Sequence, residues 1–148
     1  MMERPSVFIE TSIIGFLASR RSRSIHTASK QIRTHDWWRD ERNQFDLFVS
    51  EAVIAELAAG DETAASERLG YTQGLDMLAA IPVVDQLAQA IMEDSGLPPN
   101  AHVDAIHMAT AAVHGMDDLL TRNCKHIANA AMRPEIVRIC LEAGFPAA

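Results

Sequence analysis

The sequence predicts an α/β domain in which helices cover both faces of a mainly parallel sheet. Strand-like and helix-like segments alternate along the whole chain, which is the pattern of strand–helix–strand units. The chain has 148 residues, 48% of them hydrophobic, so it can bury the core of one domain without disulfides. No repeat, linker or low-complexity stretch divides it. We therefore expect a single domain over residues 1–148 with a sheet of four or five strands.

Four short segments have the composition of buried strands. They are apolar runs rich in β-branched, aromatic or leucine residues, and residues that favour turns or helix starts follow them. They occupy residues 6–10, 45–50, 81–84 and 119–121. The first run ends in a carboxylate, so Glu10 is expected at the carboxyl end of the first strand.

Helices are expected between these strands and after the last one. Apolar residues recur there at helical spacing, and residues that favour helix N-termini precede most of the segments. The expected N-caps are Thr11 or Ser12, Ser50, Asp61, Asp85 and Asn100. The expected helices span residues 13–18, 36–42, 61–81, 85–94, 101–116, 125–131 and 134–143, together with one that starts at residue 51. Gly70 and Gly74 indicate a bend within the segment 61–81.

Residues 101–116 form the helix around which the rest of the chain is organised. At 100° per residue, Val103, Ile106 and Val113 share one arc, which we expect to pack under the sheet. Asp104 falls on the adjacent arc and is the only carboxylate of this alanine-rich segment. It is either a solvated surface charge or a site residue.

Composition and charge exclude several classes of protein. The net charge of −7 argues against a protein that coats nucleic acid through bulk charge, although it leaves room for a local basic patch. Residues 11–35 contain no acid, and their basic residues include Arg20, Arg21, Arg23, Lys30 and Arg33. Cys124 and Cys140 form no CxxC pattern and suit a reducing compartment. No apolar run reaches the roughly 18 residues of a membrane span, so we expect a cytoplasmic protein with no membrane partner.

Polar residues follow several of the predicted strands. In open α/β sheets, sites form at the carboxyl ends of the strands, and Glu10, Glu56, Asp104 and Asn123 fall near such ends. Three carboxylates gathered there would repel one another unless a cation neutralised them. Oxygen ligands without a cysteine cluster favour Mg²⁺ or Mn²⁺ over zinc. The alternative is that each acid is a helix cap or a solvated charge.

Four sequence blocks, in this order and separation, resemble the motifs of the PIN-domain family. The blocks are FIETSIIGFL, SEAVIAELAAGD, HVDAIHMATAAVHGM and LLTRNCKHIANA, and they most resemble the VapC-type toxins of toxin–antitoxin pairs. The resemblance implies a three-layer α/β/α sandwich with a parallel sheet and an acidic Mg²⁺ or Mn²⁺ site. It also implies an endoribonuclease that hydrolyses RNA phosphodiester bonds with a Mg²⁺-activated water, a cognate antitoxin that restrains it, and a homodimer.

The resemblance also assigns roles to individual residues. The catalytic positions match Glu10, Glu56, Asp104 and Asn123, of which the three acids are the expected metal ligands. Glu10 and Asn123 each stand where the family usually has Asp, so binding of a second metal is expected to be weaker. The expected supporting residues are Thr11, Ser12, Thr121 and His107, and the expected contacts to the RNA backbone are Arg20, Arg21, Arg23 and Arg33. Related sequences commonly continue into another edge strand, so a C-terminal strand is expected to be missing.

Three alternative functions compete with this interpretation. Because Glu10 and Asn123 depart from the family pattern, the chain could be a PIN-fold module that binds RNA or a protein partner without turnover. A metal-dependent phosphatase of similar topology would need a nucleophilic Asp at the end of the first strand, where this chain has Glu10. A zinc site would use His102, Asp104 and His107, but helical geometry points His102 away from the other two.

Two further expectations concern side chains near the predicted site. His107 lies three residues after Asp104, and it is expected either to donate a hydrogen bond to that carboxylate or to be a satisfied buried histidine. His126 follows Asn123 closely and is a candidate to face the site. Trp37 and Trp38 are expected in the core or at a subunit interface, including the homodimer's, rather than stacked on bases.

Overall fold

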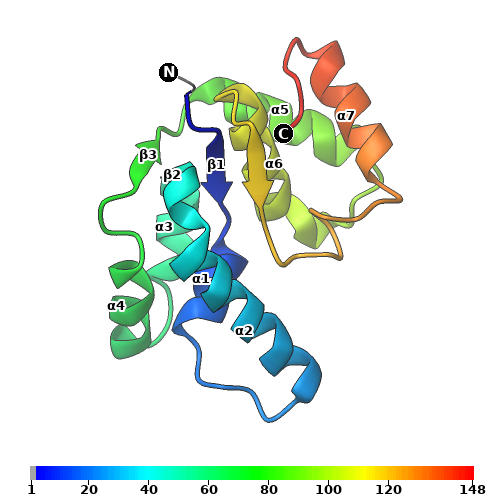
Figure 1. Cartoon of the computed structure of the whole chain (residues 1–148). Helices are drawn as coiled ribbons and strands as arrows, with labels where there is room; N and C mark the ends of the chain where they lie inside the picture. The colour runs from blue at the N-terminus through cyan, green and yellow to red at the C-terminus, as the bar shows by residue number, and fades with distance from the viewer. Residues whose placement is uncertain (1–2) are drawn as a thin grey trace.

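The computed structural model describes residues 3–148 and has a four-stranded parallel sheet flanked by helices (Figure 1). The order of the strands in the sheet is β3-β2-β1-β4, and every neighbouring pair is parallel. The strands are β1 (Ser6–Ile9), β2 (Asp46–Ser50), β3 (Asp76–Leu78) and β4 (Asp118–Leu120). The α/β fold class expected from the sequence is therefore confirmed.

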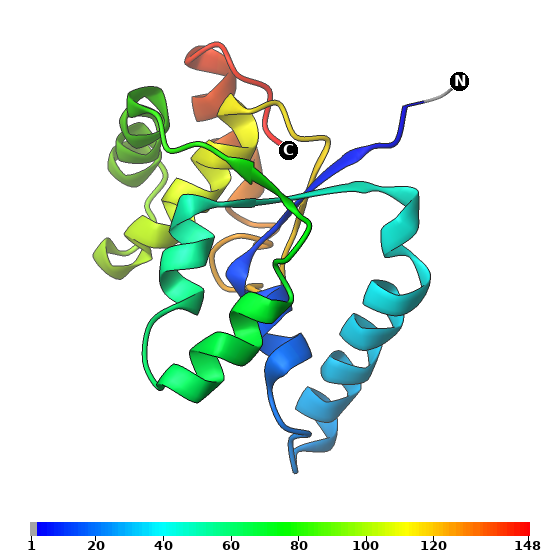
Figure 2. The ribbon, with the colours of Figure 1, turned by 90° about the vertical axis from the view of Figure 1, so that its left-hand side faces the viewer.

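Seven α-helices surround the sheet in the described part of the chain. They are α1 (Thr11–Ala18), α2 (Ile25–Asp40), α3 (Glu51–Leu57), α4 (Glu62–Gly70), α5 (Pro82–Asp94), α6 (His102–Val113) and α7 (Arg133–Glu142). Two short 3₁₀ helices, η1 (Arg42–Gln44) and η2 (Pro99–Ala101), precede β2 and α6. Figure 2 shows α5 and α6 on one side of the sheet and α2 on the other. None of the helices in residues 3–148 is both long and apolar enough to cross a bilayer.

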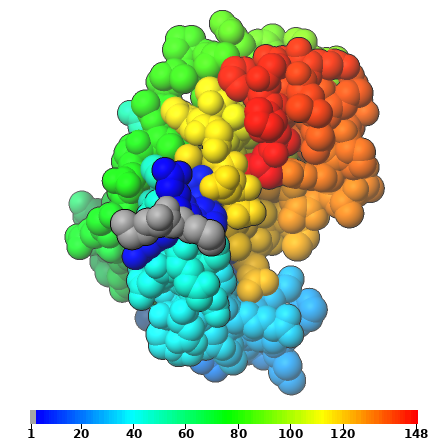
Figure 3. Space-filling view, turned by 45° about the horizontal axis from the view of Figure 1, so that its top comes forward, coloured from blue at the N-terminus to red at the C-terminus, as the bar shows by residue number. Residues whose placement is uncertain are grey.

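The buried side chains form two apolar clusters that meet at the sheet. One surrounds β1 and β2 and takes in α1 and α3, with Phe8 and Ile14 completely buried. The other joins α5, α6 and α7 and includes the completely buried Ile91. Figure 3 shows the amino end of the sheet, where the start of β1 lies between the segment leading into β2 and the segment leading into β4. The carboxyl ends of the strands, and α1, lie at the opposite end (Figure 1).

The third strand lies five residues earlier than the sequence predicts. Residues 81–84 are not a strand: β3 is Asp76–Leu78, and α5 begins at Pro82. Proline has no N–H to give to a sheet and has the φ angle of a first helical turn, so Pro82 starts the helix. Asp85 accordingly lies in the first turn of α5 and is not its N-cap, which is Ile81.

Several predicted helix boundaries are wrong for local reasons. The helix expected over 61–81 ends at Gly70, and Gly74 adopts a φ of 81° in the turn that leads into β3. Residues 125–131 form turns instead of a helix. The helix expected from residue 36 begins earlier, at Ile25, where the Ser24 hydroxyl accepts a hydrogen bond from a backbone N–H of the first turn.

The buried residues of helix α6 differ from the predicted ones. Val103 is 40% exposed, while the small residues Ala105, Ala109 and Ala112 are buried. The helix is wedged between α5 and the sheet, so its alanines allow close approach on both sides and the predicted apolar arc does not define its buried face. Asn100 lies in η2, and α6 has no side-chain cap.

The two tryptophans pack within the chain. The Trp37 ring stacks on Phe45 with 5.8 Å between centroids, and Trp38 meets the edge of Tyr71 at 6.1 Å. The guanidinium of Arg42 lies 4.1 Å from the centroid of the Trp38 ring. Both rings are partly buried against the cluster around β1 and β2, which confirms the expectation of core packing.

The N-cap of α3 offers a test of local stability. The buried Ser50 hydroxyl accepts a hydrogen bond of 3.2 Å from the Val53 N–H, as expected from the sequence. We expect Ser50→Ala to lower the free energy of unfolding by about 1 kcal/mol, measured by urea denaturation. Ser66→Ala is the control, because Ser66 is exposed inside α4 and alanine suits a helix interior. An equal effect of both substitutions would contradict the assigned cap.

Candidate metal centre

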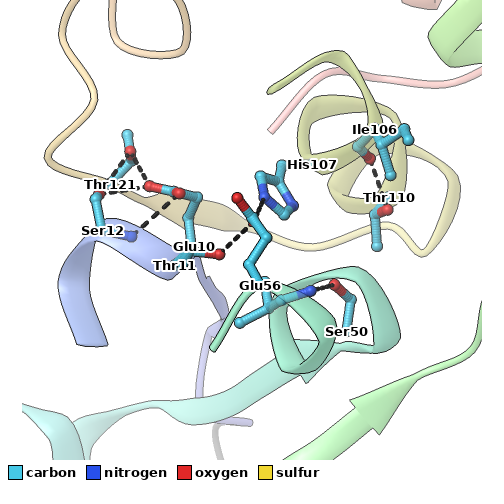
Figure 4. A network of polar contacts seen from close by, with 10 residues as sticks. Glu10, Thr11, Ser12, Ser50, Glu56, Ile106, His107, Thr110 and Thr121 are labelled. Carbon is cyan, nitrogen blue, oxygen red and sulfur yellow. Dashed lines mark hydrogen bonds and ion pairs between the residues drawn. The ribbon is translucent and has the colours of Figure 1, made fainter. Parts of the chain in front are cut away.

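Glu10 lies at the carboxyl end of β1, where the strand passes directly into α1. It is the N-cap of α1, so its backbone is extended and its side chain folds back toward the first helical turn. One carboxylate oxygen accepts hydrogen bonds from the hydroxyls of Ser12 at 2.5 Å and Thr121 at 2.6 Å, and the other accepts the Ser12 N–H at 3.1 Å (Figure 4). The residue is only 4% exposed. Three neutral donors therefore hold a buried carboxylate in one orientation.

Glu56 lies on α3, opposite Glu10, and is held from two other elements. Its Oε1 accepts a hydrogen bond from the Thr11 hydroxyl at 2.6 Å and contacts the Nε2 of His107 at 2.5 Å (Figure 4). Partial burial acts to raise the pKa of Glu56, but the hydrogen bonds from His107 and Thr11 act to lower it and prevail. The pKa of Glu56 is therefore lowered from its ordinary value. The carboxylate is thus held in its ionised form.

His107 supports Glu56 and does not contact the residue expected from the sequence. Of the two alternatives expected from the sequence, the hydrogen bond to Asp104 is not formed and His107 is a buried histidine, because the residue points inward from α6 toward Phe8 and Glu56. Its ring is completely buried, and its Nδ1 has no partner. An unpaired lone pair is less costly than an unpaired N–H, so we assign the proton to Nε2, which then donates it to Glu56.

The donor set fits a divalent cation. Glu10, Glu56 and His107 each offer an atom within 4.8 Å of the others. Glu10 is buried without an ion pair to any basic residue in the part of the chain that the structure describes, and a buried charge needs a compensating partner. The free lone pairs between Glu10 and Glu56 belong to carboxylate oxygens, because Nε2 of His107, the nitrogen on this side of the ring, is engaged by Glu56. Such oxygens suit Mg²⁺ or Mn²⁺, with Glu10 and Glu56 as the residues that would hold it.

Asp104 and Asn123 lie at the edge of this group. Asp104 is outside the group defined by 4.8 Å, and its carboxylate accepts a hydrogen bond of 2.6 Å from Nδ1 of His126. The amide oxygen of Asn123 accepts the His126 N–H at 3.1 Å, and the Asn123 N–H donates to the Thr121 hydroxyl at 2.9 Å. Since that hydroxyl also binds Glu10, a continuous chain of hydrogen bonds connects Asp104 to Glu10 through the loop after β4.

The comparison with protein families identifies the fold. The model of the PIN domain matches residues 7–131, which is most of the chain and includes every residue of the candidate metal centre described above. The chain belongs to the PIN domain family. PIN domains are generally metal-dependent nucleases that act on RNA. No curated protein and no solved structure matches this chain significantly.

The four arginines of this PIN domain that the sequence predicts to contact RNA are not part of the candidate metal centre. Arg20, Arg21 and Arg23 are exposed on the segment between α1 and α2, and Arg33 is exposed on α2. None of the four forms an ion pair with an acid within residues 3–148. They remain available to an anionic ligand.

Arg122 makes contacts that the sequence did not indicate. Its backbone N–H donates to the Ser12 hydroxyl at 2.8 Å, and its guanidinium donates to the Thr34 hydroxyl of α2 at 3.1 Å. Arg122 therefore connects the loop of this PIN domain after β4 to α1 and α2. In the sequence, the signal for Arg122 was a basic residue directly after a predicted strand. Its partners Ser12 and Thr34 lie 110 and 88 residues away along the chain, so no local sequence pattern indicates these contacts.

Proposed function

We propose that this PIN domain is a metal-dependent endoribonuclease and the toxin of a toxin–antitoxin pair. The observation that carries the proposal is the buried Glu10 carboxylate, which faces Glu56 at the carboxyl end of a parallel sheet and has no ion pair with a basic residue among residues 3–148. The family supports a nuclease acting on RNA. A divalent cation bound there would activate a water molecule and neutralise charge on the phosphodiester.

The protein's own residues would prepare this chemistry by orienting the carboxylates. Ser12 and Thr121 fix the orientation of the Glu10 carboxylate, and Thr11 and His107 keep Glu56 ionised. Because these positions are set before substrate arrives, little reorganisation is needed during the reaction. Asp104, held by His126, would serve as the third acid at the edge of the site. In-line attack by water would leave a 5′-phosphate and a 3′-hydroxyl.

Asn123 favours a site with one principal cation. Its amide oxygen is occupied by the His126 N–H, and an amide supplies no negative charge for a second ion. The same observation supports the second candidate function, a module that binds RNA or a protein partner without turnover. A cytoplasmic location, a cognate antitoxin and a homodimer are further parts of the proposal, and they rest on the resemblance of the sequence blocks to VapC-type toxins.

Metal removal and replacement distinguish the two functions. We expect the protein to cleave single-stranded RNA in the presence of Mg²⁺ or Mn²⁺, and to lose this activity completely in EDTA, because the carboxylates alone cannot activate water. Adding Mn²⁺ in excess of EDTA should restore cleavage. The products are examined for 5′-phosphate ends by their sensitivity to a 5′-phosphate-dependent exonuclease. Cleavage that persists in EDTA, or RNA binding without any metal-dependent cleavage, would contradict the nuclease function.

A further inference from the structure

Gly15 stands in the interior of α1, one turn beyond the Thr11 that binds Glu56. Glycine destabilises a helix interior relative to alanine because it loses more backbone entropy on folding. Packing does not require it here, since a Cβ atom on Gly15 would meet no atom of another element within 4 Å. A glycine in such a place leaves room for a ligand to approach the helix backbone closely.

A groove lies over this glycine, between α1 and α2. Its volume is about 300 Å³, at the lower end of small-ligand pockets. Figure 2 shows α1 with α2 on one side and α4 on the other, below the carboxyl end of β1. The groove is lined by Ser12, Gly15, Phe16, Ser19, Thr27 and Gln31. Ser12 lines the groove and its hydroxyl binds Glu10, so the groove adjoins the candidate metal centre at this residue.

Buried Gln31 holds the groove open before any ligand binds. Its amide nitrogen donates to the Ser19 hydroxyl at 2.8 Å and to the Arg20 carbonyl at 2.9 Å, and its amide oxygen accepts the Ser22 N–H at 2.9 Å. It is 4% exposed, so these hydrogen bonds are shielded from water. They fix the connection between α1 and α2 and preform the groove.

The chemistry of the groove suits a nucleobase. Its lining has no charged side chain, and it combines the partly buried ring of Phe16 with the hydroxyls of Ser12 and Thr27. Aromatic rings stack on any base, and hydroxyls can pair with the base edges. The connection that carries the exposed Arg20 and Arg23 starts at the end of α1, where cations can contact the phosphates of the same strand.

We propose that the groove between α1 and α2 binds the base of the nucleotide next to the scissile phosphate of a single-stranded RNA. The base stacks on Phe16, and the strand passes over Gly15. The inference rests on the proposed nuclease function and adds to it the place where the substrate strand lies. The occupant is RNA because the groove shares Ser12 with the candidate metal centre, and because it lies beside arginines that form no ion pair within residues 3–148.

The decisive variant is Gly15→Ala, with Gly70→Ala as the matched control. Gly70 is the last residue of α4, its Cβ position is also open, and it does not line the groove. Both substitutions are made on the Glu10→Gln background, so that binding is measured without cleavage. The probe is a short fluorescein-labelled single-stranded RNA of mixed sequence, followed by fluorescence anisotropy.

We expect Gly15→Ala to weaken RNA binding about tenfold, because its methyl group occupies the space of the strand. The same change should raise the melting temperature by about 2 °C, since alanine is the better helix former. Gly70→Ala should leave RNA binding unchanged. Phe16→Leu keeps an apolar side chain but loses the stacking surface, and it should also weaken binding about tenfold.

The outcomes separate the groove from the nuclease function. If Gly15→Ala binds RNA as tightly as Gly70→Ala while the wild-type protein cleaves RNA, the assignment of the groove as a base-binding site is wrong and the nuclease function is supported. If the wild-type protein binds RNA without cleaving it and Gly15→Ala weakens that binding, the nuclease function is wrong, and the groove is supported as an RNA-binding site without a scissile phosphate. Absence of RNA binding overturns both. A change in oligomeric state by sedimentation, with RNA binding unchanged, assigns the groove to a second copy of the chain and overturns the proposal.

Discussion

Glu10→Gln is expected to reduce metal-dependent RNA cleavage by at least about 100-fold, because it removes the best-buried charge of the candidate metal centre. Glutamine has the same size, so Ser12 and Thr121 can still bind its amide oxygen. The negative charge is lost, and so is the hydrogen bond from the Ser12 N–H, because an amide NH2 group replaces the oxygen that accepts it. Cleavage is measured with the same RNA and Mn²⁺ for both proteins, and metal affinity is measured by calorimetry.

Asp104→Asn is the informative comparison for this substitution. It should also lower the cleavage rate, but it should weaken metal binding less than Glu10→Gln, since Asp104 lies outside the group whose ligand atoms are within 4.8 Å of one another. Circular dichroism of both variants controls for folding. If Glu10→Gln binds metal and cleaves RNA as well as the wild-type protein, the assignment of the metal centre to the end of β1 is wrong.

Phe8→Ala is expected to lower the free energy of unfolding by about 3–5 kcal/mol. Phe8 is completely buried in β1, the strand that pairs with both β2 and β4, and its ring contacts His107 edge-on at 6.1 Å. Alanine would leave a cavity between the sheet and α6 that the paired strands cannot collapse to fill. Because domains are typically stable by about 5–15 kcal/mol, this one change removes a large share of the stability.

Urea denaturation of Phe8→Ala and of a surface control measures this effect. Met77→Ala is the control, because Met77 lies on the edge strand β3 and is 52% exposed. It should change the free energy of unfolding by no more than about 0.5 kcal/mol. A similarly small effect of Phe8→Ala would contradict the packing of β1 at the centre of the domain.

The sequence was sufficient where a structural signal lies within a few neighbouring residues. The N-caps at Ser50 and Asp61 were predicted correctly, because a cap depends on a side chain and the N–H group three residues later. It failed at residues 81–84, where an apolar run resembles a strand but Pro82 begins a helix. The prediction of the buried face of α6 also failed. Alanines fit against neighbours on any side of a helix, so they do not reveal which faces other elements cover.

For the candidate site as well, part could be predicted from the sequence and part depended on the tertiary structure. The sequence by itself determined which residue types stand after each strand, and it was enough to predict Glu10 and Glu56 as members of one polar site. Only the tertiary structure decided their partners: Thr121 binds Glu10 from 111 residues away, and His107 binds Glu56 from 51 residues away. The reason is physical, since a side chain's direction follows from its local backbone, whereas its contacts depend on how β1, β4, α3 and α6 are brought together by the sheet.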